Sequence, residues 1–183
     1  MNTNAIERDG CALVLVDWQQ RLLPALHGGT AALERALQLA DVAQLLHVPV
    51  IGTEQNPAGL GPNDPAIRER CASTLSKMHF DACTDRLLPA LQAATAKPLR
   101  DVVLAGCEAH VCLMQTALGL RRAGLHVWVV AEACASRDPA HHALAMQRLR
   151  EAGTAIVSVE MVAFEWLRSC EDTAFRSVLA RLK

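Results

Sequence analysis

The feature that most constrains the fold is a regular alternation of short apolar runs with longer helix-like segments. The apolar runs fall at residues 11–16, 48–53, 73–77, 101–105, 126–131 and 154–158. No linker, repeat or low-complexity segment interrupts the alternation. Strand-helix units joined by right-handed crossovers form a parallel sheet with helices on both faces. The pattern therefore predicts a three-layer, Rossmann-like α/β fold with six parallel strands in the order 3-2-1-4-5-6.

Several helix boundaries are marked by capping residues. Two Asp-Pro pairs predict helix starts, because proline suits the first helical position: Asp64-Pro65, for a short helix through Arg70, and Asp138-Pro139, for a helix that closes before Gly153. Thr30 is the expected N-cap of the helical segment 31–46, and Gly124 is expected to end the helix that follows Cys112.

Length and composition set wider limits. The 183 residues are expected to form one domain, residues 1–183, with a sizeable core. Because the net charge is −1 and aromatic residues make up 3% of the chain, neither a nucleic-acid surface nor a membrane surface is expected. Residues 1–10 are polar and no apolar run approaches the roughly 18 residues of a membrane span, which favours a cytoplasmic protein without a targeting peptide. The seven scattered cysteines indicate reduced thiols.

One cysteine stands where a nucleophile is favoured. Residues 102–124 have the pattern of a buried strand, a tight turn and an amphipathic helix, with Cys112 near the helix start. At such positions free backbone N–H groups and the helix dipole favour the thiolate, and thiol pKa values fall from about 8.5 to as low as about 3.5 to 7.5. The pattern predicts a nucleophile with a lowered pKa at Cys112. The alternative is a small buried hydrophobic residue, a common use of cysteine.

Two charged residues lie at the ends of other predicted strands. The apolar run 12–16 stops at Asp17, and the carboxyl ends of inner parallel strands face the crevice where α/β sheets bind ligands. Strands 1 and 4 are neighbours in the predicted order, so Asp17 and Cys112 would meet. Lys77 ends a strand two positions from Asp17, roughly 10 Å at ~4.8 Å spacing, so only its long side chain could close the gap. The alternatives are a turn cap at Asp17 and a snorkelling surface lysine at Lys77.

These residues belong to motifs that resemble a known family. The motifs are Asp-x-Gln (Asp17, Gln19), a lysine followed three residues later by phenylalanine (Lys77, Phe80), and G-C-E-A-H-V-C-L-x-Q-T-A (Gly106 to Ala117). Together they resemble the isochorismatase-like cysteine hydrolases. Residues 53–61, TEQNPAGLG, and the EAHVC stretch resemble the branch of isochorismatase domain-containing proteins. The resemblance extends from about residue 11 to about residue 162 and implies the same strand order.

The resemblance also implies a chemistry, namely metal-independent hydrolysis of a small amide or related C–N bond. Asp17 would take the proton of Cys112, Lys77 would hold the negative charge of both, and the thiolate would attack the carbonyl to give a thioester. By resemblance, the backbone amides of Glu108 and Cys112 form the oxyanion hole, with a cis peptide between Cys107 and Glu108. Ammonia or a small amine would leave, and water activated by Asp17 would hydrolyse the thioester.

Six residues are candidate contacts for a small-molecule substrate: Trp18, Gln19, Glu54, Gln55, Phe80 and Cys107. Glu54 and Gln55 are candidates by resemblance, and a solvated loop is their alternative. Trp18 could instead pack in the core or in an interface. Asp81 stands where the family often has serine.

Neither a cofactor nor a metal is expected. Nicotinamidases of the superfamily carry an aspartate and several histidines after the second strand, whereas residues 52–61 contain neither residue type. Cys107, His110 and Cys112 offer three possible metal ligands, but structural zinc usually draws on two clusters and the sequence has no second one. His141 and His142 are adjacent, so on a helix they point to different faces and favour a surface role.

Three functions remain open. The first is the cysteine hydrolase. The second is Asp-driven vinyl-ether hydrolysis of the isochorismatase type, against which the presence of Cys112 argues. The third is a catalytically idle oligomeric binding module, against which the intact Asp17, Lys77 and Cys112 set argues. A mean hydropathy of +0.17 is high for a small soluble chain and predicts a homo-oligomer, a dimer or higher.

Overall fold

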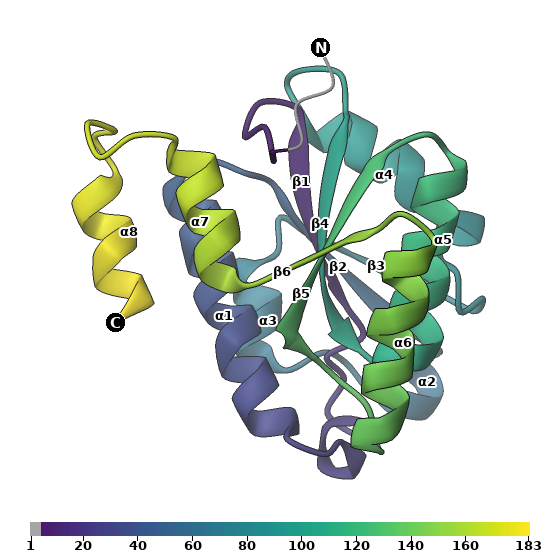
Figure 1. Ribbon diagram of the computed structural model, residues 1–183. Helices are drawn as coiled ribbons and strands as arrows, with labels where there is room; N and C mark the ends of the chain where they lie inside the picture. The colour runs from purple at the N-terminus through teal and green to yellow at the C-terminus, as the bar shows by residue number, and fades with distance from the viewer. Residues whose placement is uncertain (1–4) are drawn as a thin grey trace.

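The computed structural model describes residues 5–183 and is built around a six-stranded, all-parallel sheet (Figure 1). Its strands are β1 (Cys11–Val16), β2 (Val50–Gln55), β3 (Ser73–Lys77), β4 (Asp101–Cys107), β5 (His126–Ala135) and β6 (Ala155–Val157). The order β3-β2-β1-β4-β5-β6 confirms the predicted topology. The expectation about a targeting peptide concerns residues 1–10, of which the first four lie outside the described residues.

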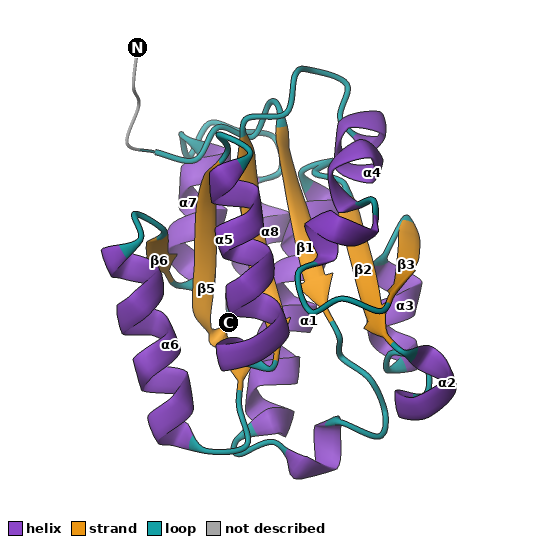
Figure 2. Ribbon diagram, turned by 90° about the vertical axis from the view of Figure 1, so that its right-hand side faces the viewer, coloured by secondary structure: helices purple, strands orange, loops and turns teal. Residues whose placement is uncertain are grey.

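Helices cover both faces of the sheet (Figures 1 and 2). One face carries α1 (Gly29–Leu45), α3 (Pro65–Arg70), α7 (Val159–Leu167) and α8 (Phe175–Leu182), and the other carries α4 (Leu87–Ala94), α5 (Met114–Arg122) and α6 (Pro139–Glu151). Short helical segments complete the chain: η1 (Leu23–Ala25), α2 (Pro57–Leu60), η2 (Ala82–Asp85) and the π-helical turn η3 (Ala109–Leu113). No helix among residues 5–183 has the length and apolar character that a membrane crossing needs.

The apolar run of β1 is continuous because the strand is buried on both faces. Its side chains alternate between the two cores, so Leu13 and Leu15 join the α1 side whereas Val14 and Val16 join the α5 side. Alternation of direction with burial on both sides is typical of central strands in parallel sheets. Asp17 therefore directly follows the strand, between two packed layers and at the carboxyl edge of the sheet, where the neighbouring strands also end.

Two of the predicted caps are present and a third is corrected. The carboxylates of Asp64 and Asp138 accept hydrogen bonds from the second residues of α3 and α6, at 2.9 and 2.8 Å. Thr30 does not cap α1, because the helix begins at Gly29 with Gly28 as its N-cap. Gly28 has a φ of +64°, a left-handed conformation that glycine adopts without cost.

Several strands extend further toward their carboxyl ends than the apolar runs predict. β2 continues through Gln55 and β4 through Cys107, each two residues beyond the predicted end. In β5 the register shifts, so that Leu104 of β4 pairs with Val129 while Gly106 pairs with Cys134. Polar and small residues continue these strands because backbone pairing and the layers above them hold them in place. The extensions form the edge at which the candidate site lies.

Candidate active site

Asp17 and Lys77 form a buried ion pair at the carboxyl edge of the sheet. Lys77 Nζ lies 2.7 Å from Asp17 Oδ2, and the two side chains are 1% and 0% exposed. The lysine reaches across β2, which separates its own strand from β1, so its side chain closes the gap expected from the topology. A lysine with this burial is not a snorkelling surface residue.

The backbone of Asp17 turns its carboxylate toward the lysine. Asp17 has a φ of +52°, in the left-handed region that aspartate tolerates better than most residues. Its N–H donates to the carbonyl of Thr53 at 3.1 Å, and the Thr53 hydroxyl donates to Asp17 Oδ1 at 2.7 Å. One carboxylate oxygen is thus held by β2 and the other by Lys77.

Three oxygens surround the ammonium group of Lys77. Besides its ion pair with Asp17, it donates hydrogen bonds to Gln55 Oε1 at 2.7 Å and to the carbonyl of His79 at 3.4 Å. Gln55 is itself fixed, since its Nε2 donates to the carbonyl of Met78 at 2.9 Å. These contacts hold the Lys77 ammonium group in one defined position.

Cys112 lies next to this ion pair. Its side chain is buried, at 7% exposure, in η3 immediately before α5. Burial and then the negative charge of Asp17 raise the pKa of Cys112 to about 12, while the positive charge of Lys77 opposes them. Asp17 and Lys77 also act on this pKa through side-chain hydrogen bonding to the thiol. The structure thus brings Asp17, Lys77 and Cys112 together.

The direction of this pKa shift corrects the expectation drawn from the helix start. A helix N-terminus lowers a thiol pKa, but here desolvation and a neighbouring carboxylate outweigh it. At neutral pH, Cys112 is a neutral thiol beside Asp17. Its proton can pass to that carboxylate when the sulfur attacks, and Lys77 can then balance the thiolate.

Cys112 is therefore expected to react slowly with iodoacetamide at pH 7, after the exposed Cys170. Between pH 7 and pH 9 its rate should rise about tenfold per pH unit, because the thiolate fraction grows by that factor below the pKa. Peptide mapping after timed alkylation measures both rates. A Cys112 that matches Cys170 at pH 7 would indicate a resting thiolate and contradict the raised pKa.

The turn between β4 and η3 holds the groups expected to form the oxyanion hole. The peptide bond between Cys107 and Glu108 is cis, and the carbonyl of Glu108 accepts the N–H groups of Val111 and Leu113 at 3.0 and 3.3 Å. Gly106, just before this turn, has a φ of +147°, and a Cβ there would lie 2.2 Å from the carbonyl oxygen of Val16. Only glycine allows this close approach of β1 and β4.

Three candidate substrate contacts, Gln19, Glu54 and Gln55, hold the strand ends together. Gln19 is fully buried, and its Nε2 donates to the carbonyls of Gln55 and Gly61 while its Oε1 accepts the N–H of Gln55 at 2.9 Å. Glu54 Oε1 accepts the N–H of Asn63 at 2.8 Å. Because Glu54 and Gln55 are each 9% exposed, the alternative of a solvated loop is excluded for both. Their polar atoms are used to shape the site.

The remaining three candidates differ in exposure. Trp18 and Cys107 are entirely buried and pack in the core on the α1 side, which for Trp18 is the alternative of a core residue. The position of Cys107 follows from alternation along β4, because Val103 and Ala105 lie on the same side. Trp18 does not follow the alternation of β1, since the left-handed backbone of Asp17 interrupts the strand pattern before it. Phe80 is 51% exposed, three residues after Lys77, and remains open to a ligand.

Thr53 and Arg137 contribute to the site without having been predicted from the sequence. Thr53 orients Asp17, as described above, and the Nε of Arg137 donates to Glu108 Oε1 at 2.7 Å. Thr53 could have been recognised as a candidate, because it is a polar residue at the end of the apolar run 48–53. Nothing in the local sequence indicates the contact of Arg137, because it joins segments from two strand ends.

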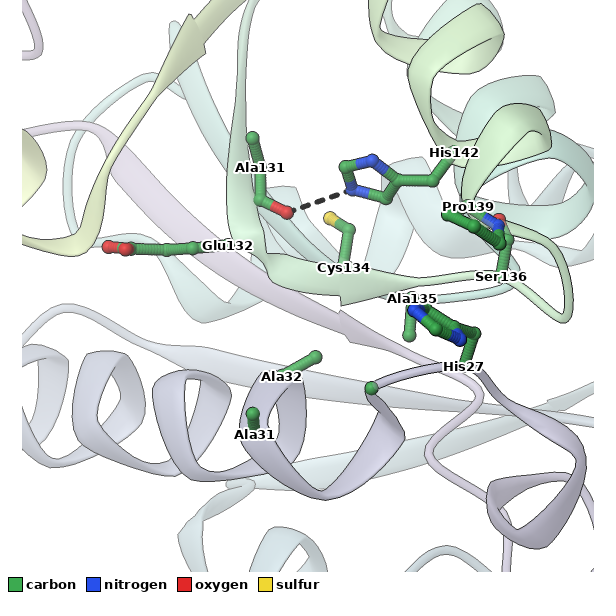
Figure 3. Close-up of a pocket in the computed structure, with 11 residues that line it drawn as sticks. His27, Ala31, Ala32, Ala131, Glu132, Cys134, Ala135, Ser136, Pro139 and His142 are labelled. Carbon is green, nitrogen blue, oxygen red and sulfur yellow. Dashed lines mark hydrogen bonds between the residues drawn. The ribbon is translucent and has the colours of Figure 1, made fainter.

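A cavity of about 260 Å³ lies beside the carboxyl end of β5 (Figure 3). Its walls come from the start of α1, the end of β5 and the start of α6, and include His27, Cys134, Ser136 and His142. His142 Nε2 lies 3.0 Å from the carbonyl oxygen of Ala131. Asp17, Lys77 and Cys112 are not among the lining residues, so this cavity is separate from the ion pair and its thiol.

The possible metal ligands of residues 107–112 diverge in the structure. Cys107 packs in the core on the α1 side and Cys112 in the core on the α5 side. His110 turns to Ser136, with Nδ1 3.0 Å from the hydroxyl oxygen, and its ring stacks on that of His141 with centroids 4.7 Å apart. Within residues 5–183, no three His, Cys, Asp or Glu side chains are arranged to hold a metal ion.

Known proteins share both the sequence and the fold. The chain is 32% identical over 173 residues to isochorismatase domain-containing protein 2A of Mus musculus, covering 93% of this chain and 82% of that protein. It is 36% identical over 150 residues to isochorismatase domain-containing protein 2 of Bos taurus, covering 81% and 71%. The MAR1 ribonuclease structure from Caenorhabditis elegans has a TM-score of 0.89 at 29% identity, covering 97% of this chain and 92% of that chain.

The octameric hydrolase of unknown specificity named YcaC, from Escherichia coli, has a TM-score of 0.87. The match covers 100% of this chain and 89% of that chain at 23% identity, so it shows the fold alone. The family model of the isochorismatase domain matches residues 11–161, nearly the stretch over which the motifs predict the resemblance. With that match and relatives above 30% identity, the chain belongs to the isochorismatase family of hydrolases.

Proposed function

We propose that this protein is a metal-independent cysteine hydrolase that cleaves a small amide or a related C–N bond. The observation that carries the proposal is the buried ion pair of Asp17 and Lys77, at 2.7 Å, acting on the thiol of Cys112. A base, a counter-charge and a nucleophile at one sheet edge are the parts that acyl transfer needs. A purely structural protein would gain little from a buried lysine at the same place.

The first half of the reaction forms a thioester. Asp17 accepts the proton of Cys112, and the sulfur attacks the substrate carbonyl carbon while Lys77 balances the negative charge left in the group. The tetrahedral oxyanion is stabilised by the backbone N–H groups of Glu108 and Cys112. When the oxyanion collapses, the C–N bond breaks, and the departing nitrogen takes the proton from Asp17 and leaves as ammonia or an amine.

The second half returns the enzyme to its starting state. A water molecule gives a proton to Asp17 and attacks the thioester carbon. As the C–S bond breaks, the proton on Asp17 passes to the sulfur of Cys112, and the product leaves as a carboxylic acid. Because Cys112 is only 7% exposed, a substrate whose carbonyl group is small and sterically open fits this reaction best.

A phosphodiester substrate is less well supported. The similar structure from Caenorhabditis elegans is named a ribonuclease, but that name describes the Caenorhabditis elegans protein alone. This chain has 18 basic and 19 acidic residues, so it has no excess of positive charge to attract a nucleic-acid backbone. Vinyl-ether hydrolysis driven by the aspartate is also less favoured, because it leaves the Cys112 thiol beside Asp17 and Lys77 without a role.

We also propose that the protein is a homo-oligomer. Five large apolar side chains are exposed among residues 5–183: Met78, Phe80, Leu144, Met161 and Phe164. Exposed apolar side chains in this number favour association with other copies. The related fold of YcaC from Escherichia coli is described as octameric, which is consistent with this proposal without fixing the number of chains.

The hydrolase proposal is tested by a substrate screen joined to mass spectrometry. Small amides, hydroxamates and ureides are incubated with the protein, ammonia or amine release is measured, and acid-quenched samples are mapped for an acyl group on the peptide that contains Cys112. Cys112→Ser is expected to lose turnover by more than about 10³-fold, since residues of one catalytic unit fail together. The matched Cys134→Ser, another buried thiol outside the site, should keep both turnover and adduct. Turnover by Cys112→Ser near the wild-type rate, with no acyl group on the peptide that contains residue 112, would exclude covalent catalysis.

A further inference from the structure

The chain just beyond Lys77 holds the lysine in place. The carbonyl of His79 accepts from Lys77 Nζ at 3.4 Å, and the carbonyl of Met78 fixes the Gln55 amide that also binds it. The side chains of Met78 and His79 are exposed. They therefore make few apolar contacts of their own, so other bonds have to fix the position of these two carbonyls.

The N–H groups of Met78 and His79 donate to Asp85 Oδ2, in η2, at 3.1 and 2.8 Å. Both η2 and the residues just before it are in turn held by α5. The Thr116 hydroxyl accepts the N–H of Ala82 at 3.1 Å and donates to the carbonyl of Phe80 at 3.3 Å. Between these two residues, Asp81 Oδ2 pairs with Arg122 Nη2 at 2.7 Å. Backbone and side chain of the segment that follows Lys77 are thus both held by one helix.

Gly119 provides the space for this contact. It lies inside α5, where glycine is less favourable than alanine. A Cβ at this position would lie 2.4 and 2.5 Å from the two carboxylate oxygens of Asp81. The Asp81 carboxylate also accepts the N–H of Cys83 at 2.9 Å, which caps η2. The glycine is explained by close packing of a carboxylate against the helix.

The same helix follows directly on Cys112. Thr116, Gly119 and Arg122 come four, seven and ten residues after Cys112, a spacing that places side chains on one side of a helix. We use the term α5 clamp for Asp81, Thr116, Gly119 and Arg122. The clamp connects the element that carries the thiol to the segment that supports the ammonium group.

We propose that Asp81 is a positioning residue that, through the α5 clamp, fixes the Lys77 ammonium group relative to the Cys112 thiol. The inference rests on the proposed function, in which Lys77 balances the thiolate of Cys112. It also accounts for an aspartate where the family often has serine. A serine could still accept the N–H of Cys83, but it could not pair with Arg122.

The test uses alkylation of Cys112 by iodoacetamide at pH 8, read by peptide mapping against Cys170 in the same sample. Gly119→Ala displaces the Asp81 carboxylate and should move the Lys77 ammonium group away from the thiol. Lys77 lowers the pKa of Cys112, so its displacement raises that pKa and should slow alkylation about tenfold, the effect of one pKa unit. General loosening would act in the opposite direction, by exposing the thiol.

Further variants show whether the effect passes through Asp81. In an Asp81→Ala background, Gly119→Ala should cause no further slowing, because no carboxylate remains to be displaced. Asp172→Asn is the matched control: Asp172 also accepts a nearby N–H and pairs with an arginine, Arg8, away from the site. It should leave the alkylation rate unchanged. Should Gly119→Ala fail to fold, Asp81→Asn tests the same contact and is expected to give a smaller decrease.

Lys77→Met separates this inference from the proposed function. If Lys77→Met slows alkylation but Gly119→Ala and Asp81→Asn leave it unchanged or faster, the clamp is not a positioning device and the inference is overturned. If Lys77→Met itself has no effect, the lysine does not act on the thiol and the proposed catalytic group is wrong. Slowing by Lys77→Met, Gly119→Ala and Asp81→Asn, with Asp172→Asn unchanged, is the result that we expect.

Discussion

Replacing Asp17 with asparagine is expected to abolish turnover while making Cys112 easier to alkylate. Asparagine keeps the shape of the side chain but cannot accept the thiol proton, so the rate of hydrolysis should fall by at least about 10³-fold. The negative charge of Asp17 is the second largest cause of the raised pKa of Cys112, and Lys77 would then act on the thiol unopposed. The pKa should fall, and alkylation by iodoacetamide at pH 8 should accelerate about tenfold or more.

Loss of turnover together with faster alkylation would identify Asp17 as a base that also keeps the Cys112 thiol protonated in the resting enzyme. The matched control is Asp101→Asn, which alters another buried carboxylate, at the opposite end of β4, whose Oδ1 accepts from Trp128 Nε1 at 2.9 Å. Asp101→Asn should change neither turnover nor the alkylation of Cys112. Turnover by Asp17→Asn within tenfold of the wild-type rate would remove Asp17 from the proposed mechanism.

Replacing Lys77 with methionine is expected to destabilise the protein by about 3 kcal/mol. Methionine fills a similar volume but leaves the carboxylate of Asp17 buried without its counter-charge, and breaking one side of a buried ion pair typically costs about 3 to 5 kcal/mol. The free energy of unfolding is measured by urea denaturation. Lys97→Met, in which the exposed ion pair with Asp9 is lost, is the matched control and should cause no measurable change.

A double variant tests whether the loss arises from the uncompensated charge. Asp17→Asn combined with Lys77→Met removes both charges of the pair, so the double variant should be more stable than Lys77→Met alone. A double variant as unstable as the sum of the two single variants would show that packing around the pair, and not its charge balance, determines the stability.

Much of the fold follows from local pattern. Apolar runs of strand length between helix-like segments indicated the parallel sheet, and the Asp-Pro pairs marked the starts of α3 and α6, because proline and an aspartate cap act within one turn. The start of α1 was missed because Gly28, and not Thr30, caps it. The carboxyl ends of β2, β4 and β5 were also missed, since polar residues continue them and only neighbouring strands hold such residues in place.

The sequence by itself determined the strand order, and with it the placing of Asp17 and Cys112 at neighbouring strand ends, because right-handed crossovers leave few other arrangements. Tertiary structure decided the rest. Whether Lys77 reached across β2 depended on the path of one side chain, and whether Cys112 had a raised or lowered pKa depended on burial and on the carboxylate beside it. Helix position is a local property that the sequence displays. Desolvation and the charge of a residue 95 positions away exist only once the chain has folded.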